Sequence, residues 1–139
     1  MKRAVSWLRL SYRLGALVDL AAGLMMLFPA LFAFMNRPAA FQPGLDYRYA
    51  MGMGAPLMFG WAALLLWADR SPLERRDVLP LTLLVIVGEV ATQAWGIAAG
   101  FIPLPALLPS FGMQALLCAC FIFSYFNSSR YVAGLGRSV

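Results

Sequence analysis

Long apolar runs separated by short polar segments dominate the pattern of this chain. Each run reaches the roughly 20 residues that a helix needs to cross a hydrocarbon core about 30 Å thick, and none shows the alternation of a barrel strand. A backbone in lipid must satisfy its own hydrogen bonds, so we interpret each run as a transmembrane helix. The four expected spans cover about 14–35, 49–68, 78–102 and 107–126.

The composition supports this interpretation. Of 139 residues, 62% are hydrophobic and 12% are charged, a charged share about half that of an average soluble domain. No linker or second composition regime interrupts the chain. We therefore predict an all-α, four-transmembrane-helix bundle in which residues 1–139 form a single integral membrane domain.

The basic residues predict the orientation of the bundle. One side of the expected spans carries nine of them, and the other side carries only Arg37 and Arg48. The nine are Lys2, Arg3, Arg9, Arg13, Arg70, Arg75, Arg76, Arg130 and Arg137. By the positive-inside rule both termini should lie in the cytoplasm. We expect the chain to be a multi-pass protein of the bacterial inner membrane. The net charge of +5 then indicates contact with anionic headgroups, and nucleic acid is not expected as a partner.

The segment before the first expected span is basic and amphipathic. Residues 5–13 are typical of a short helix that lies at the membrane interface before the chain enters lipid. The run 14–35 is longer than the ~7–15 apolar residues at the centre of a cleaved signal peptide. We therefore expect this run to stay attached as the first span.

Glu89 is the most informative residue, because the span 78–102 around it contains no Lys, Arg or His. A carboxyl group at membrane depth is costly unless it is protonated, hydrogen-bonded or in contact with water, so it indicates a functional site. Gln93 lies one turn further on the same face. Counting about 1.5 Å of rise per residue places Gln114 and Cys118 of the fourth span at the same two depths. We expect these four residues to form one polar layer near the midplane.

Three residues are expected to surround this layer. Asp19 should lie in a shallower, second shell about 8 Å from the cytoplasmic boundary, level with Ser124 and Tyr125. Trp61 and Trp95 fall deep enough to form the wall of an apolar pocket, although ordinary core packing would explain them as well. The candidate ligand or proton site is therefore the layer together with Asp19.

Two interpretations of Glu89 remain open. A neutral carboxyl group bonded to a glutamine amide would be a structural clamp between helices. Alternatively, Glu89 binds a proton, a cation or the polar head of a ligand. No metal site is expected, because the chain has no His and its two cysteines point about 200° apart on a helix. An enzyme is not favoured, since no nucleophile motif and no paired carboxylates on one helix face are present.

Small residues predict where the helices approach closely. Glycines recur at multiples of four residues in the first three spans, which is typical of helix contacts in lipid. The pairs are Gly15 and Gly23, Gly52 and Gly60, and Gly96 and Gly100. We expect all three stripes to face the interior of the bundle.

One stretch resembles a known family. Residues 47–82 read YRYAMGMGAPLMFGWAALLLWADRSPLERRDVLPLT, which is similar to small bacterial four-helix membrane proteins of the DoxX-like kind. The resemblance implies the size and topology already predicted, and it carries over no residue roles and no cofactor.

Three functions are compatible with these features. The first is a binding or accessory protein that holds a small amphipathic molecule, such as a lipid or quinone, or a partner membrane protein. The second is a proton-coupled carrier of small solutes that acts as a homodimer. The third is a structural subunit of a larger membrane complex.

Overall fold

The computed structural model describes residues 2–135, and these residues form helices and connecting turns without any strand. The helices are α1 (Lys2–Leu27), α2 (Pro29–Asn36), α3 (Leu45–Ala68), α4 (Val78–Ala98) and α5 (Leu104–Leu135). Four segments are long and apolar enough to cross a membrane, namely Val5–Leu27, Leu45–Ala68, Val78–Ala98 and Leu104–Gly134. The predicted all-α architecture with four membrane-spanning helices is confirmed. The orientation with both termini in the cytoplasm stays a prediction.

The first helix differs from the expected span 14–35. Helix α1 is continuous from Lys2 through the expected interfacial residues 5–13, and it ends at Leu27. The reason for the end is Pro29, which has no N–H to donate to a carbonyl one turn earlier and which begins α2 instead. Phe28 between the two helices has an extended backbone, with φ −114° and ψ 93°. The membrane-spanning part of α1 therefore lies closer to the N-terminus than hydropathy alone indicates.

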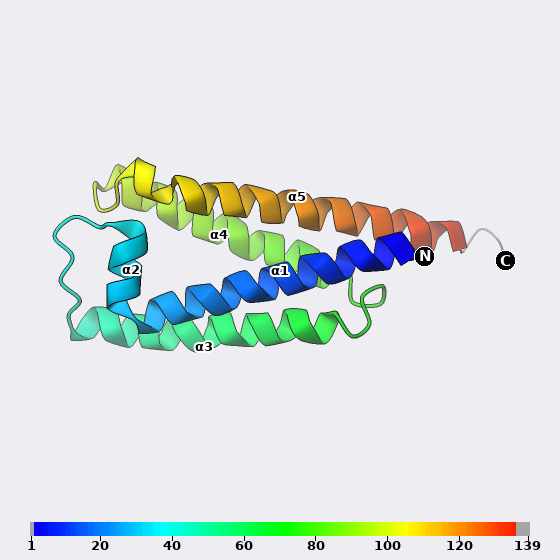
Figure 1. The fold of residues 1–139 in the computed structure, drawn as a ribbon, viewed down its shortest axis with the longest axis horizontal. Helices are drawn as coiled ribbons and strands as arrows, with labels where there is room; N and C mark the ends of the chain where they lie inside the picture. The colour runs from blue at the N-terminus through cyan, green and yellow to red at the C-terminus, as the bar shows by residue number, and fades with distance from the viewer. Residues whose placement is uncertain (1, 136–139) are drawn as a thin grey trace.

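Helix α2 crosses the other helices at the end of the bundle away from the N-terminus (Figure 1). The loop after it returns to α3 and contacts the tip of the α4–α5 hairpin, where the Ala39 N–H donates to the Phe101 carbonyl over 2.9 Å. Rings of Phe32, Phe41 and Tyr47 pack together with centroid distances of 5.3, 5.8 and 5.1 Å. These contacts attach α2 and its loop to both sides of the bundle.

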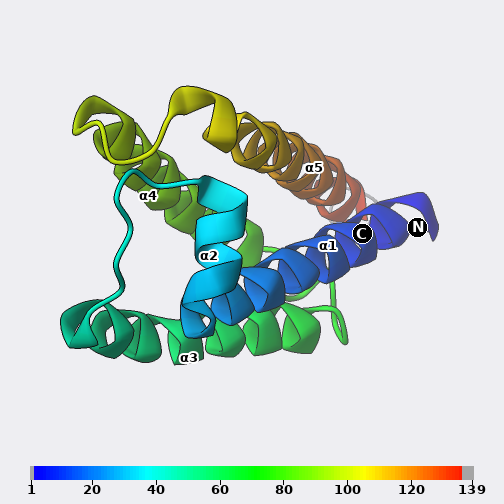
Figure 2. The same ribbon diagram turned by 60° about the vertical axis from the view of Figure 1, so that its left-hand side comes forward.

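Helix α1 lies between α3 and α5. It packs most extensively against α3 and also against α5, and α5 in turn packs against α4. Helices α3 and α4 follow one another in the chain but make few contacts, and they diverge away from the turn that joins them (Figure 2). The bundle is therefore built from a first hairpin (α1 to α3) and a second hairpin (α4 and α5), which meet mainly where α1 touches α5.

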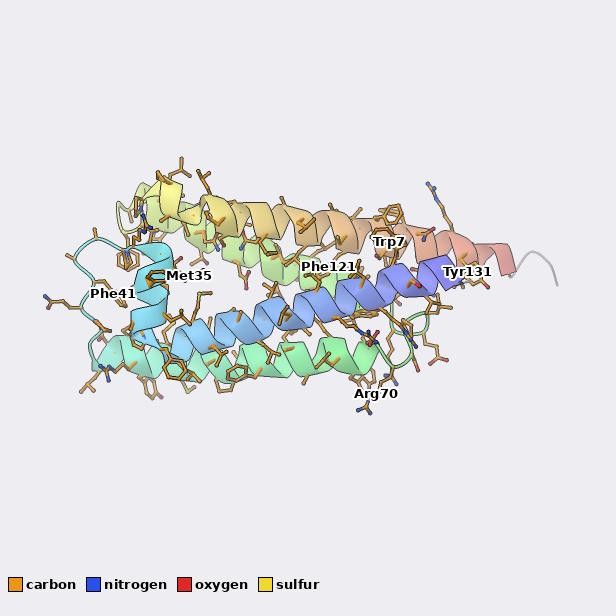
Figure 3. All side chains as sticks on the ribbon, viewed as in Figure 1. Trp7, Met35, Phe41, Arg70, Phe121 and Tyr131 are labelled. Carbon is orange, nitrogen blue, oxygen red and sulfur yellow. The ribbon has the colours of Figure 1, made fainter. Side chains whose placement is uncertain are left out.

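The buried core lies in the half of the bundle near the α3–α4 turn. Leu8 and Tyr12 of α1, Leu65 of α3, Leu79 of α4 and Phe121 of α5 are all 0% exposed and belong to one cluster. Figure 3 shows Phe121 on the side of α5 next to α1. All four long helices thus contribute to this core. It holds the two hairpins together near the α3–α4 turn.

Only one of the three glycine stripes marks a close helix crossing. A Cβ atom added at Gly15 would lie 2.9 Å from side-chain atoms of both Leu65 and Phe121. A Cβ atom added at Gly60 or Gly96 would meet no heavy atom outside its own helix segment within 4 Å. Gly60 and Gly96 therefore do not mark close helix crossings, although Gly96 is buried. Gly15 has no side chain at the point where α1 packs between α3 and α5, which allows the three helices to approach closely there.

Polar contacts hold α1 to the turn between α3 and α4. The Tyr12 hydroxyl donates to the carbonyl of Arg75 over 3.0 Å, and the Arg13 guanidinium binds the Asp69 carboxylate at 2.9 Å. The Arg75 guanidinium lies 3.5 Å above the Trp67 ring. The guanidinium groups of Arg13 and Arg75 are therefore engaged at this turn.

Candidate polar site between three helices

Two hydrogen bonds join α4 to α5 inside the bundle. The Gln114 amide donates to the Glu89 carboxylate, with Nε2 and Oε2 3.3 Å apart. The Gln93 amide donates to the Ser110 hydroxyl over 3.1 Å. Because α4 and α5 are antiparallel and each pair on one helix is four residues apart, the two bonds form at successive turns. The structure thus brings together Glu89, Gln93 and Gln114 of the predicted layer, whereas Cys118, which was expected at the same depth, makes no described polar contact with them and packs on the apolar core cluster.

Ser110 is a member of this cluster that the sequence analysis does not single out. It precedes Gln114 by four residues and therefore lies on the same face of α5. The four-residue spacing from Gln114 could have indicated Ser110 from the sequence. Three prolines near Ser110 argue against a helix there, however, and so hide this relation. Helix α5 begins at Leu104 and continues through Pro109, so Ser110 is helical and not part of an extended loop.

Asp19 lies deeper than expected. The hydroxyls of Ser11 and Ser124 are 2.8 Å apart, and both residues are 0% exposed. Asp19 follows Ser11 by eight residues, which corresponds to about 12 Å along α1. The expectation that Asp19 lies level with Ser124 is therefore wrong, because α1 begins well before residue 14. Asp19 instead lies one turn beyond Gly15, on the face of α1 that meets Phe121 of α5, and its Oδ2 is buried without a hydrogen-bond partner.

We call Asp19, Glu89, Gln93, Ser110 and Gln114 the acid–amide layer. Asp19 comes from the first hairpin and the other four come from the second, so the layer lies where the two hairpins meet. Gln114 is 7% exposed, and Asp19, Glu89, Gln93 and Ser110 are partly buried. The layer is accordingly a polar cluster enclosed by apolar helices.

Three oxygen atoms of the layer are buried without a hydrogen-bond partner. They are Asp19 Oδ2, Gln93 Oε1 and Gln114 Oε1. A buried polar atom without a partner costs about 1–3 kcal/mol, so such atoms are uncommon in folded proteins. All three are acceptors. The layer therefore has acceptor capacity that the described residues do not use.

No described basic side chain compensates the two carboxyl groups. Helix α4 contains no Lys or Arg, and the only Arg within Leu104–Leu135 is Arg130, which lies 16 residues and about 24 Å from Gln114. On α1, Arg9 and Arg13 contact Asp69 at 3.9 and 2.9 Å. Among the described residues, α4 and the part of α5 beside it therefore bring no positive charge to Glu89.

Cys118 and the two tryptophans contribute less than expected. Cys118 is partly buried and packs against the apolar core cluster. Trp61 donates its Nε1–H to the Thr82 hydroxyl over 3.2 Å, which links α3 to α4 near their turn. Trp95 is 70% exposed, so it does not form the wall of a pocket within this chain. Neither tryptophan therefore adds a described polar contact to the layer.

Comparisons with protein-family models, with curated proteins and with solved structures give no match. The resemblance of residues 47–82 to DoxX-like proteins consequently stays a prediction. The function of this membrane protein has to be argued from the acid–amide layer and its surroundings.

Proposed function

We propose that this protein binds a small amphipathic molecule, with the polar head of that molecule held in the acid–amide layer. The observation that supports this most directly is the set of three buried oxygens, on Asp19, Gln93 and Gln114, that have no partner. A bound head that donates hydrogen bonds would satisfy them. A purely structural clamp needs only the bond from Gln114 to Glu89 and gives no role to the unused acceptors.

The surroundings favour an amphipathic ligand over a fully polar one. Apolar side chains cover the lipid-facing sides of the helices, as Leu57, Leu84 and Val87 illustrate with exposed fractions of 70, 70 and 62%. A solute without an apolar part would have to pass this hydrocarbon-like environment at a cost of several kcal/mol. A molecule already dissolved in the bilayer avoids this cost, and it can approach between α3 and α4, which make few contacts.

Native mass spectrometry of the protein released from membranes tests this proposal. Wild type should retain a small lipid-soluble molecule, and Glu89→Leu should lose it while keeping its helical circular dichroism. Thr92→Val is the matched control, because Thr92 is exposed on the same helix and its hydroxyl bonds only to the Gly88 carbonyl at 3.0 Å. Equal retention in wild type and Glu89→Leu would contradict the proposal, and complete absence of a bound molecule in all variants would favour the clamp or a structural subunit.

A proton-coupled carrier acting as a homodimer is a second candidate. The observation in its favour is that each hairpin carries a carboxyl group inside an apolar helix, Asp19 of α1 and Glu89 of α4, since carboxyl groups within membrane helices often belong to proton pathways. The discriminating variant is Glu89→Gln, which keeps the shape and hydrogen bonds of a neutral carboxyl group but cannot titrate. Solute-dependent proton uptake into liposomes that is lost in Glu89→Gln would support the carrier. Identical proton traces for wild type and Glu89→Gln would exclude it.

A further inference from the structure

A partly open cavity lies at the end of the bundle away from the α3–α4 turn, where α1 stops and α2 begins. Its volume is about 150 Å³, and it is lined by Met26, Leu27, Pro29, Arg48 and Gly52. The first two residues end α1, Pro29 begins α2, and the last two belong to the first half of α3. An apolar cavity of this size can hold a group as large as benzene. The cavity therefore has room for part of a lipid chain.

The sequence explains why this space is left open. Because Pro29 ends α1 and redirects the chain, α2 runs from the junction toward α5 and crosses α3 without lying along it (Figure 1). On α3, a Cβ atom added at Gly52 would meet no heavy atom within 4 Å. The proline and the glycine together leave a hollow that no side chain of the described residues fills.

Arg48 is the charged residue of this cavity. Its side chain is exposed, and both ion pairs within residues 2–135 belong to Asp69 at the opposite end of the bundle. Its guanidinium group has no hydrogen bond to another described residue either. The charged residues of this end are Arg37 and Arg48 against the single acid Asp46. The balance of charge beside the cavity therefore favours an anion.

The position of Arg48 along α3 corresponds to the depth of lipid headgroups. Helix α3 has 24 residues and a length of about 36 Å, slightly more than the hydrocarbon core of about 30 Å. Arg48 is the fourth residue of this helix, so its long side chain can reach the headgroup region. Gly52 lies one turn further, on the hydrocarbon side of Arg48. A phosphate at Arg48 would thus have the apolar part of the cavity directly below it.

We propose that this cavity binds one anionic phospholipid, with the phosphate at Arg48 and the upper part of an acyl chain over Gly52. A guanidinium group binds a phosphate through two parallel N–H bonds. A choline head has a phosphate too, but its trimethylammonium group is repelled by the positive charge of this end. A free phosphate has no chain to fill the apolar part. The site lies apart from the acid–amide layer, and the inference does not rest on the proposed function.

The test is native mass spectrometry of the full chain in a neutral detergent, titrated with phosphatidylglycerol. The affinity of the first bound lipid should be at least about fivefold higher than for phosphatidylcholine with the same chains. Arg48→Gln should lower the affinity for phosphatidylglycerol about fivefold, which is the effect of one basic residue near anionic headgroups. Gly52→Leu should also lower it, because the new side chain occupies the cavity while Arg48 keeps its charge.

Two matched variants control for charge and for size. Arg37→Gln removes the same charge from the same end, but Arg37 does not line the cavity. Gly60→Leu makes the same enlargement eight residues further along α3, where a Cβ atom also has open space. Both should bind phosphatidylglycerol like wild type. Glu89→Leu should do so as well, so that this inference and the proposed function fail separately. Circular dichroism shows whether each variant is folded.

Each other outcome would overturn the proposal. Equal affinity for the two lipids would remove the anionic head, and an equal loss in Arg37→Gln and Arg48→Gln would show only general attraction to charge. Competition by glycerol 3-phosphate at the lipid concentration would indicate a free phosphate ester as the ligand. Wild-type affinity in Gly52→Leu would place the acyl chain outside the cavity. If Arg48→Gln does not fold, Gly52→Leu and its Gly60→Leu control decide the question alone.

Discussion

Gly15→Ala should destabilise the bundle, because α1 has no room for a side chain at this position. The added Cβ would lie 2.9 Å from Leu65 Cδ1 and from Phe121 Cζ, about 0.6 Å or more inside an ordinary carbon–carbon contact. Both neighbours are 0% exposed, so neither can turn away into lipid, and α1 must move apart from α3 and α5. Overpacking of this kind costs about 1–3 kcal/mol. The higher helix propensity of alanine returns about 1 kcal/mol at most, so we expect a net loss of up to about 2 kcal/mol against wild type and of about 1–3 kcal/mol against an alanine at an open helical position.

The measurement is reversible unfolding by sodium dodecyl sulfate in mixed micelles, followed by circular dichroism. Gly60→Ala is the matched control, because Gly60 also lies inside a long helix but has open space where the Cβ would be. It should unfold at the wild-type midpoint or slightly later. The reasoning is refuted if Gly15→Ala and Gly60→Ala have the same midpoint, since the contact of α1 with α3 and α5 would then not be tight.

Three further predictions concern polar contacts and topology. A double-mutant cycle of Ser11→Ala and Ser124→Ala should show a coupling free energy of about 0.5–2 kcal/mol in the same assay, which is the range of interhelical hydrogen bonds in membranes. If the two losses in unfolding free energy simply add, the contact is contradicted. Tyr12→Phe should cost about 1 kcal/mol, because it removes a buried donor to the α3–α4 turn; unchanged amide-hydrogen exchange in that turn would speak against this. Reporter fusions within 71–76 should indicate the cytoplasm and fusions within 38–46 the opposite side, and a mixed signal would overturn the orientation.

Hydropathy predicts the long helices well where a polar segment marks their ends. The expected span 49–68 corresponds to Leu45–Ala68, and 78–102 corresponds to Val78–Ala98. It misplaces the first span because the chain stays apolar across Pro29 and only the missing N–H of proline ends the helix there. A continuous apolar run therefore hides a break that backbone chemistry imposes.

The candidate site is predictable as far as single helices define it. Spacing and depth are sufficient to associate Glu89, Gln93 and Gln114, because residues four apart share a face. They are not sufficient to place Asp19, since the level of one helix against another depends on where each begins and how they cross. The direction of Trp95, by contrast, is available from spacing. Trp95 follows Gln93 by two residues and therefore points about 200° away from it on a helix, in agreement with its exposed fraction of 70%.

The division into two hairpins has a consequence for biosynthesis. Helices α1 and α3 precede α4 and α5 in the chain, so the insertion machinery receives the first hairpin before the second. At that stage Asp19 has a bilayer around it and none of the layer residues of α4 and α5. A newly inserted first hairpin therefore carries an acidic group that is shielded only after the second hairpin docks.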